Sequence, residues 1–188
     1  NPLNVALTGK GVISAISVTP SSLDFGTVAL ADSADRTITV SNIGDGDLII
    51  PDDSTYFVGA DASEFTIVIG GAPINLAQGQ SNQMTIRFKP ADTGERDATL
   101  RIVSNDTTNN GVFGVPVTAT GIAEPDIALN PTSWNYGSVF LNSSAAKTFF
   151  VTNEGTAELV VNINGMTLLG EDLDEFDVVD STGAPFTV

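Results

Sequence analysis

The sequence predicts an all-β chain made of tandem β-sandwich units, and three observations support this prediction. Alternating apolar and polar runs of strand length recur along the chain, with turn signals between them roughly every 8–12 residues. No segment keeps a helical periodicity for more than one turn. The stretch SLDFGTV at Ser22–Val28 returns almost unchanged as SWNYGSV at Ser133–Val139, which is the sign of a repeat architecture.

The repeat has a period of 111 residues over most of its length, so that Pro20 corresponds to Pro131 and Asn42 to Asn153. The first residues belong to the pattern too, because NVALTGKG near the N-terminus resembles GVPVTATG, which begins at Gly114. We therefore expect three parts: the last strand of a preceding unit at 1–13, a complete unit at 14–122, and an incomplete unit lacking its last strands at 123–188.

The first half of the complete unit is a series of short predicted strands. The first strand is expected to break at Pro20 and to resume through Leu23 and Phe25, which point inward, with Gly26 at a close-packed bend. The next strand alternates, so its apolar residues share one face. The expected ranges are 36–42, with Ile38 and Val40 inward, then two short segments around a polar turn at 47–51 and 55–59, and a strand at 63–69.

The second half contains three longer predicted strands, which brings the unit to about seven strands, as in an immunoglobulin-size sandwich. Pro116 lies within the last of them and predicts an edge position or a local bulge, because proline cannot donate to a ladder. The three strands are expected at 82–90, with Met84, Ile86 and Phe88 inward, at 97–106, with Ala98, Leu100 and Ile102 inward, and at 111–120, with Val115, Val117 and Ala119 inward.

An Asn-x-Gly sequence ends the 36–42 strand and recurs in the second unit, at Asn42–Gly44 and Asn153–Gly155. An Asn side chain can bond the backbone two residues further on, and Gly accepts a positive φ. We therefore expect the chain to reverse direction at both places.

Six motifs follow one another in the complete unit: PSSLDFGTV, RTITVSNIG, DASEF, FKPADTG, ATLRIVSND and VTATG. This ordered set resembles the ASH/Hydin-type immunoglobulin-like domain, which in bacteria is often called the choice-of-anchor D repeat. The resemblance implies a seven-strand immunoglobulin-like sandwich related to the major sperm protein fold, arranged in tandem on secreted or surface-anchored bacterial proteins. It implies no catalytic residues.

The last unit departs from this pattern at two positions, where Trp134 replaces Leu23 and Tyr136 replaces Phe25. Two aromatic rings that lie two apart on a strand share a face and form a candidate sugar-stacking pair. The correspondence with Leu23 and Phe25 favours packing in the core instead.

The missing residue types narrow the function. The chain has no histidine and no cysteine, which excludes a Ser-His-Asp triad, a Cys nucleophile, disulfides and zinc sites built on these residues. We therefore expect that the protein is not an enzyme. The net charge of −16 opposes binding to nucleic-acid phosphates. No apolar run approaches the roughly 18 residues of a membrane span, so no membrane insertion is expected.

Acidic turns are the candidate metal sites, and no cofactor other than Ca²⁺ is expected. The candidate turn lacks the spaced ligand set of an EF-hand, and the alternative is a solvated turn. The candidate Ca²⁺ ligands are Asp45, Asp47, Asp52 and Asp53.

Two further features stay open at this point. The acidic run Glu171–Asp177 has counterparts in Asp61 and Glu64, which favours a turn shared by both units over a metal site. Asn105 and Asn142 begin N-x-S/T sequences, and the sequence does not establish whether either carries a glycan.

The leading interpretation is a non-catalytic structural module whose immunoglobulin-like repeats form a stalk or fibre of an extracellular or cell-surface prokaryotic protein. Its expected partners are other copies or units of the same protein. A strand from one copy that completes the last unit of the next would join copies head to tail, and an excerpt from a longer array explains the partial units equally. The alternatives are an adhesive or carbohydrate-directed accessory module of a secreted enzyme and a ciliary or centrosomal scaffold.

Overall fold

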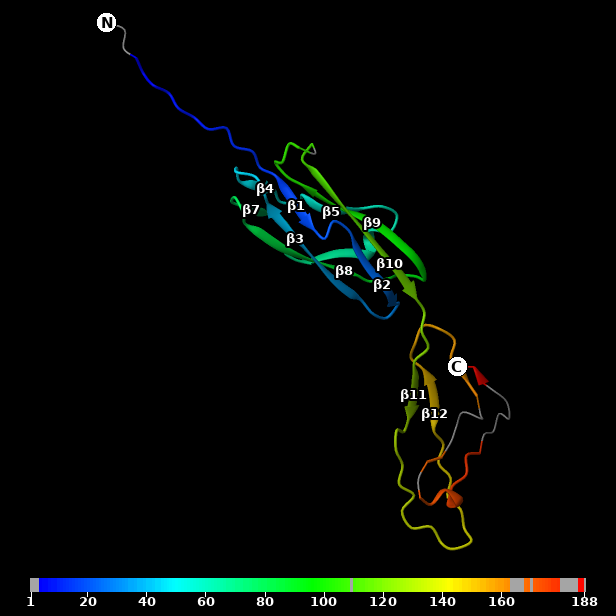
Figure 1. Ribbon diagram of the computed structural model, residues 1–188. Coiled ribbons are helices and arrows are strands. Elements are labelled where there is room, and N and C mark those ends of the chain that lie inside the picture. The colour runs from blue at the N-terminus through cyan, green and yellow to red at the C-terminus, as the bar shows by residue number, and fades with distance from the viewer. Residues whose placement is uncertain (1–3, 109, 163–167, 170, 180–185, 188) are drawn as a thin grey trace. The chain divides into compact units, whose positions relative to one another are not determined.

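The computed structural model describes residues 4–108, 110–162, 168–169, 171–179 and 186–187. The chain divides into two compact units, Asn1–Ile122 and Ala123–Val188. Figure 1 shows that both are built from strands, and helical structure in the described residues is confined to short 3-10 turns. The predicted all-β class is therefore correct. No helix in the described ranges is long and apolar enough to cross a membrane.

Ten short strands occur in the described part of the first unit, and the predicted break at Pro20 separates the first two. The strands are β1 Ile16–Thr19, β2 Leu23–Ala29, β3 Ala34–Asn42, β4 Leu48–Ile50, β5 Thr55–Val58, β6 Phe65–Ile69, β7 Ile74–Leu76, β8 Ser81–Phe88, β9 Gly94–Val103 and β10 Val112–Ile122.

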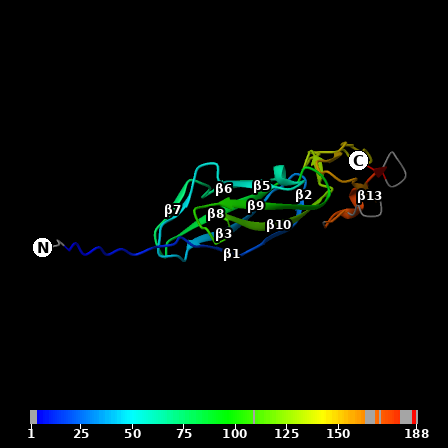
Figure 2. The same ribbon diagram turned by 90° about the horizontal axis from the view of Figure 1, so that it is seen from above.

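The ten strands form a two-layer sandwich with a small extra sheet at one end (Figures 1 and 2). One layer has the order β1-β3-β8-β6, the other has the order β2-β10-β9-β5, and β4 pairs with β7. Neighbouring strands in the two layers are antiparallel, apart from β2 and β10, which are parallel. β2 and β10, which are the first and last strands of the second layer in chain order, therefore run in the same direction.

The core lies between the two layers and is built from alternating inward side chains. Aromatic rings join the layers, because the Phe25 ring of β2 lies with its centroid 5.7 Å from that of Phe65 in β6 and 5.8 Å from that of Phe88 in β8. Every predicted inward residue is buried: Leu23, Phe25, Ile38, Val40, Met84, Ile86, Phe88, Ala98, Leu100, Ile102, Val115, Val117 and Ala119.

Gly26 forms the predicted bend, but the bend is not close-packed. A Cβ at this position would meet no atom within 4 Å, whereas φ is +71°, a conformation that favours glycine. The Gly26 N–H donates to Asp24 Oδ1 at 2.8 Å. Gly137 repeats the arrangement with φ of +64° and a 2.8 Å bond to Asn135 Oδ1. The two similar stretches SLDFGTV and SWNYGSV thus share an Asx-Gly turn.

Pro116 lies in a central strand, yet one of its sides is unpaired. Along β9 the pairing covers the whole of β10, with Pro116 opposite Thr99. Along β2 it begins only at Val117, and it then shifts register between Thr118 and Thr120. The edge position predicted from the proline exists locally, because β2 does not reach this residue.

One strand of the first unit was not indicated by the sequence. β7 contains three residues, and it pairs with β4 through Leu48 opposite Leu76 and Ile50 opposite Ile74. Three residues are too few to show alternation, so the pairing depends on tertiary contacts that the local pattern does not contain.

The second unit repeats several elements of the first. β11 (Ile127–Asn130) pairs with β12 (Phe150–Asn153), and β13 (Val160–Val161) pairs with β14 (Phe186–Thr187). The rings of Tyr136 and Phe176 lie 6.2 Å apart, at the positions that correspond to Phe25 and Phe65. The 111-residue register of the sequence therefore also holds for the contacts.

Trp134 does not pack as its counterpart Leu23 does, so this expectation is wrong. Its exposed fraction is 52%, against 6% for Leu23. The Lys147 ammonium lies 3.8 Å from the centroid of the Trp134 ring, which is a cation–π contact. A surface cation, and not the opposite sheet, covers this ring.

Candidate functional site: the lead-in clamp

The segment through which the chain enters the first unit is held by hydrogen bonds along its whole length. This lead-in segment, Ile13–Ile16, contacts the turn Asn42–Gly46 and the pair Asn105–Asp106, and we call these three parts together the lead-in clamp. Two backbone bonds define it: Ile43 N donates to Ala15 O at 2.9 Å, and Gly46 N donates to Ile13 O at 2.8 Å.

Asn42 is the centre of the clamp and is only 1% exposed. Its Nδ2 donates to the carbonyl oxygens of Gly46 at 2.7 Å and Leu76 at 2.9 Å. Its Oδ1 accepts from Gly44 N at 2.9 Å and from Ala15 N at 3.5 Å. The predicted Asx turn is present, and the same amide also binds the lead-in segment and the end of β7.

Gly44 allows the lead-in segment to lie directly against the turn. A Cβ at this position would overlap the carbonyl oxygen of Ile13 and would lie 2.6 Å from Ala15 N. No side chain fits in this space. Close backbone approach, and not a positive φ, therefore explains the glycine.

Asn105 and Asp106 hold the lead-in segment from the other side. Ser14 Oγ donates to Asn105 O at 3.0 Å, and Ile16 N donates to Asp106 Oδ2 at 2.9 Å. Both donors lie within the lead-in segment, so the end of β9 is tied to the start of β1.

The Asp106 side chain is 2% exposed, and both of its carboxylate oxygens accept hydrogen bonds. Its Oδ1 accepts from both the N–H and the hydroxyl of Thr108, each at 2.7 Å. Burial by itself raises the pKa of Asp106, but the bonds from Ile16 N and from the Thr108 hydroxyl and N–H outweigh it and hold the pKa below its usual value. The carboxylate is therefore ionised in the fold at neutral pH.

The side chain of Asn105 is also occupied. Its Nδ2 donates to Asp47 O at 2.9 Å, and its Oδ1 accepts from Ile49 N at 2.8 Å. A glycan on this amide would replace one of the two Nδ2 hydrogens and leave one N–H to donate to Asp47 O. Asn142 differs, because it is exposed in a turn with φ of +59°.

The second unit contains an equivalent clamp, in which Glu124–Asp126 is the lead-in segment. Asn153 Oδ1 accepts from Asp126 N at 3.2 Å and from Gly155 N at 3.0 Å. Glu154 N donates to Asp126 O at 2.8 Å. A Cβ at Gly155 would overlap the Glu124 oxygen and the Asp126 nitrogen, as at Gly44.

The last strand of the first unit is also anchored at its end. Leu30 N donates to Ile122 O at 3.0 Å. A Cβ at Gly121 would overlap Asp92 O and lie 2.9 Å from Pro90 Cβ, so β10 runs directly against the β8–β9 loop. In the next unit Glu124 O already accepts from Thr156 N at 2.7 Å.

The four candidate Ca²⁺ ligands have other roles or stand apart. Asp45 Oδ1 accepts from Ile13 N at 2.9 Å, and its Oδ2 pairs with Lys10 at 2.7 Å. These two contacts lower the pKa of Asp45, and the bond to Lys10 has the larger effect. Thr156, the counterpart of Asp45, binds Glu124 N in the same way, at 3.2 Å.

Asp47, Asp52 and Asp53 lie on exposed turns. Asp52 Oδ1 accepts from Asp53 N at 3.2 Å. Among the residues that the structure describes, no group of three or more acidic side chains is arranged to hold a metal ion. Ca²⁺ binding at these residues stays a prediction, and no preformed set of ligands supports it.

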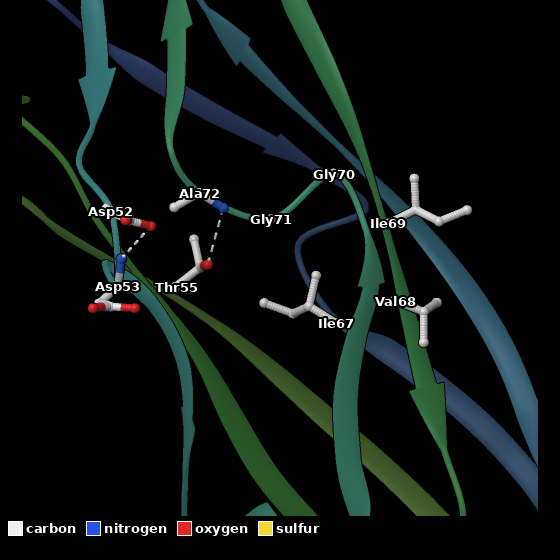
Figure 3. Close-up of a pocket in the computed structure, with 9 residues that line it drawn as sticks. All are labelled: Asp52, Asp53, Thr55, Ile67, Val68, Ile69, Gly70, Gly71 and Ala72. Carbon is white, nitrogen blue, oxygen red and sulfur yellow. Dashed lines mark hydrogen bonds between the residues drawn. The ribbon is translucent and has the colours of Figure 1, made fainter.

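A surface pocket of about 260 Å³ lies beside Asp52 and Asp53 (Figure 3). Thr55 and the stretch 67–72 form the rest of its lining, and Thr55 Oγ1 accepts from Ala72 N at 3.3 Å. Figure 3 shows the carboxylates on one side and Ile67 across from them. The lining contains no partner that would activate Thr55 as a nucleophile, since neither Asp side chain bonds to its hydroxyl among the described contacts.

The shared acidic turn of both units is confirmed, and in the first unit its partner is an arginine. Glu64 Oε1 accepts from Arg96 Nε at 2.9 Å, and Asp61 Oδ2 accepts from Asp97 N at 3.0 Å. In the second unit Glu175 N donates to Asp172 O, as Glu64 N donates to Asp61 O. In the first unit these carboxylates fix the β8–β9 hairpin.

Comparison with known proteins gives one match that bears on identity. Residues 14–113 match the model of a family described as HYDIN/CFA65/VesB-like, Ig-like domain. No curated protein matches the chain.

Solved structures of similar fold include a protein of unknown function from Porphyromonas gingivalis W83, with 18% identity, a TM-score of 0.47 and coverage of 57% of this chain and 47% of that one. The ASH/PapD-like domain 7 of human CEP192 has 14% identity, a TM-score of 0.43 and coverage of 65% and 98%. The VesB protease of Vibrio cholerae has 14% identity, a TM-score of 0.41 and coverage of 56% and 31%. The chain thus spans less than half of two of these proteins. With TM-scores below 0.5, they add nothing to the family match.

Proposed function

The chain belongs to the HYDIN/CFA65/VesB-like immunoglobulin-like domain family, and on this basis we propose that it is a non-catalytic spacer whose tandem units form part of a stalk. The observation that carries the proposal is the pair of equivalent lead-in clamps. In each unit an Asn-x-Gly turn fixes the backbone at the point where the chain enters.

The anchors leave little free backbone between the two units. Ile122 O is bound within the first unit and Glu124 O is bound within the second, so Ala123 is the residue between these two bound carbonyl groups. A flexible linker needs several residues with free backbone dihedrals. One residue gives few such dihedrals, which supports a spacer that transmits position along the chain.

We extend the proposal to the partner, which is another unit of the same kind. Val5 and Leu7 correspond to Val115 and Val117 of β10. They are 72% and 89% exposed, whereas both β10 residues are fully buried. The segment Asn4–Gly11 therefore has the pattern of a last strand with exposed apolar side chains, and strand donation between copies is one way to bury them.

The surface chemistry supports a place outside the cell for the stalk. The net charge of −16 favours solubility and opposes adsorption to nucleic acid or anionic lipid.

Pulsed electron–electron double resonance, which measures the distance between two spin labels, tests the spacer. Spin labels at Ser81→Cys and Thr152→Cys lie on exposed strand positions of the two units, and the chain has no other cysteine. We expect a narrow distance distribution. A variant with a Gly-Ser linker inserted after Ala123 is the matched control and is expected to give a broad one.

Equal widths in the parent chain and the linker variant would contradict the spacer. Strand donation is tested separately by light scattering over a range of concentrations. Multimers that disappear in Leu7→Asp but persist in Thr8→Asp are the expected result. Monomers at every concentration would remove strand donation and leave the spacer untouched.

A further inference from the structure

We infer that the first unit is a load-bearing element, in which tension along the chain acts in shear on the parallel ladder between β2 and β10. The inference extends the proposed spacer function, because a stalk transmits force through each of its units. It depends on three observations within the first unit: the direction of the two strands, the position of their ends, and the anchoring of the lead-in segment.

β2 and β10 run in the same direction side by side. Their register begins with Val117 opposite Leu23 and ends with Ile122 opposite Ala29. The chain reaches β2 from the lead-in segment and leaves the unit after Ile122. Figure 1 shows the start of β1 and the end of β10 at opposite ends of the first unit.

This arrangement fixes how a pulling force acts. A force on the N-terminal side pulls β2 back toward its own first residue, Leu23. A force on the C-terminal side pulls β10 forward past Ile122. The two strands are therefore pulled in opposite directions along a common axis, so the hydrogen bonds that join them resist together and do not break one after another.

The lead-in clamp adds a second resistance in series. β1 pairs with β3 through four residues, from Ile16 opposite Asn42 to Thr19 opposite Thr39. Before β1, the bonds to Ile13, Ala15 and Ile16 hold the chain to the turn and to Asp106. Force must break this group before it peels β1 from its layer, which delays loading of β2.

The end of β10 is held at its other side as well. β10 pairs with β9 from Val112 to Gly121, and β9 also carries β5. The close approach of Gly121 to Pro90 blocks sideways movement at this end. The ladder of β10 with β2 is thus shorter than its ladder with β9, and it is the one that tension loads.

Single-molecule force spectroscopy on the full chain tests the inference by changing only the points of attachment. Handles at Gly11→Cys and Ala123→Cys load the ladder in shear. Handles at Ala31→Cys and Ala123→Cys pull on the adjacent ends of β2 and β10 and peel the same ladder open. Gly11 and Ala31 are exposed, and the chain has no native cysteine.

We expect the shear pair to unfold the first unit at a several-fold higher force than the peeling pair, since forced unfolding follows the unfolding rate along the pulled direction. Equal forces for the two pairs would overturn the inference. Thermal melting of both variants establishes that each is folded. If one is not, Gly9→Cys and Asp32→Cys replace Gly11→Cys and Ala31→Cys, because both positions are exposed.

The result is independent of the spacer test. Both handle pairs act within the first unit, so a broad distance distribution between the units leaves the force comparison unchanged. Equal forces together with a narrow distance distribution would remove the load-bearing role and keep the spacer.

Discussion

The side-chain amides of Asn42 and Asn153, which are 111 residues apart, bind the backbone in the same way. Asn42 Nδ2 donates to Gly46 O and Asn153 Nδ2 donates to Ala157 O, each at 2.7 Å. A contact repeated at the same register in both units belongs to the architecture of the unit. The repetition that is visible in the sequence therefore reports how each unit holds the chain that leads into it.

Replacing Asn42 by Ala is expected to destabilise the first unit by about 3 kcal/mol, because buried backbone groups lose their partners. Denaturant unfolding followed by circular dichroism measures the change. Asn75→Ala is the matched control, since Asn75 is exposed on β7, and it is expected to stay within about 0.5 kcal/mol of the parent chain. A loss as small as that of the control would show that the clamp contributes little to stability.

Three glycine-to-alanine variants separate close approach from backbone conformation. Gly44→Ala is expected to cost about 3 kcal/mol or more, because its Cβ overlaps Ile13. In Gly26→Ala the new Cβ meets no atom, but alanine is forced to adopt the positive φ of Gly26, which costs about 1–2 kcal/mol. Gly9→Ala meets nothing and is expected to be neutral within about 0.5 kcal/mol. Any other order of the three unfolding free energies would contradict the packing described for Gly44.

The pH dependence of stability is expected to report on Asp106. Its folded pKa lies below the unfolded value of 3.8, so the ionised carboxylate stabilises the fold above that pH. This contribution is lost as the pH falls below 3.8 toward the folded pKa. Unfolding free energies between about pH 7 and pH 2 are expected to fall more steeply in the parent chain than in Asp106→Asn. Asp32→Asn, at an exposed turn, is the control, and parallel curves for the parent chain and Asp106→Asn would refute the assignment.

Calcium is expected to leave the melting temperature unchanged relative to magnesium at the same concentration. Asp45 is already engaged by Lys10 and Ile13, and the structure assembles no set of three acidic ligands in its described ranges. A rise specific to Ca²⁺ that disappears in Asp47→Asn or Asp52→Asn would restore the metal site.

The fold was predictable from the sequence to the level of strands and of the faces they bury. Alternation identifies inward residues reliably where a strand is long, as Met84, Ile86 and Phe88 illustrate. It fails for β7, which has three residues, and for Trp134, whose surroundings depend on a contact with Lys147 that the pattern does not contain.

The lead-in clamp was predictable only in part. Asn-x-Gly indicates a turn, which the structure contains at Asn42, but the buried bonds to Ala15 and Leu76 join distant segments. The role of Asp106 cannot be predicted from its neighbours in the sequence, because its partner Ile16 is 90 residues away. The sequence around Asn105 indicates only a glycan acceptor, because its partners Asp47 and Ile49 are 58 and 56 residues away.

The measurement that tests the central claim most directly is the spin-label distance distribution between Ser81→Cys and Thr152→Cys in the variant Asn153→Ala. The account predicts a narrow distribution in the parent chain and a broader one in Asn153→Ala, because that variant removes the bond from Asp126 N and leaves Asp126 held to the turn by the Glu154 N–H alone. Asn135→Ala removes an exposed amide outside the clamp and is expected to leave the distribution narrow. Equal widths for the parent chain and Asn153→Ala would contradict the claim that the clamp fixes the chain between the units.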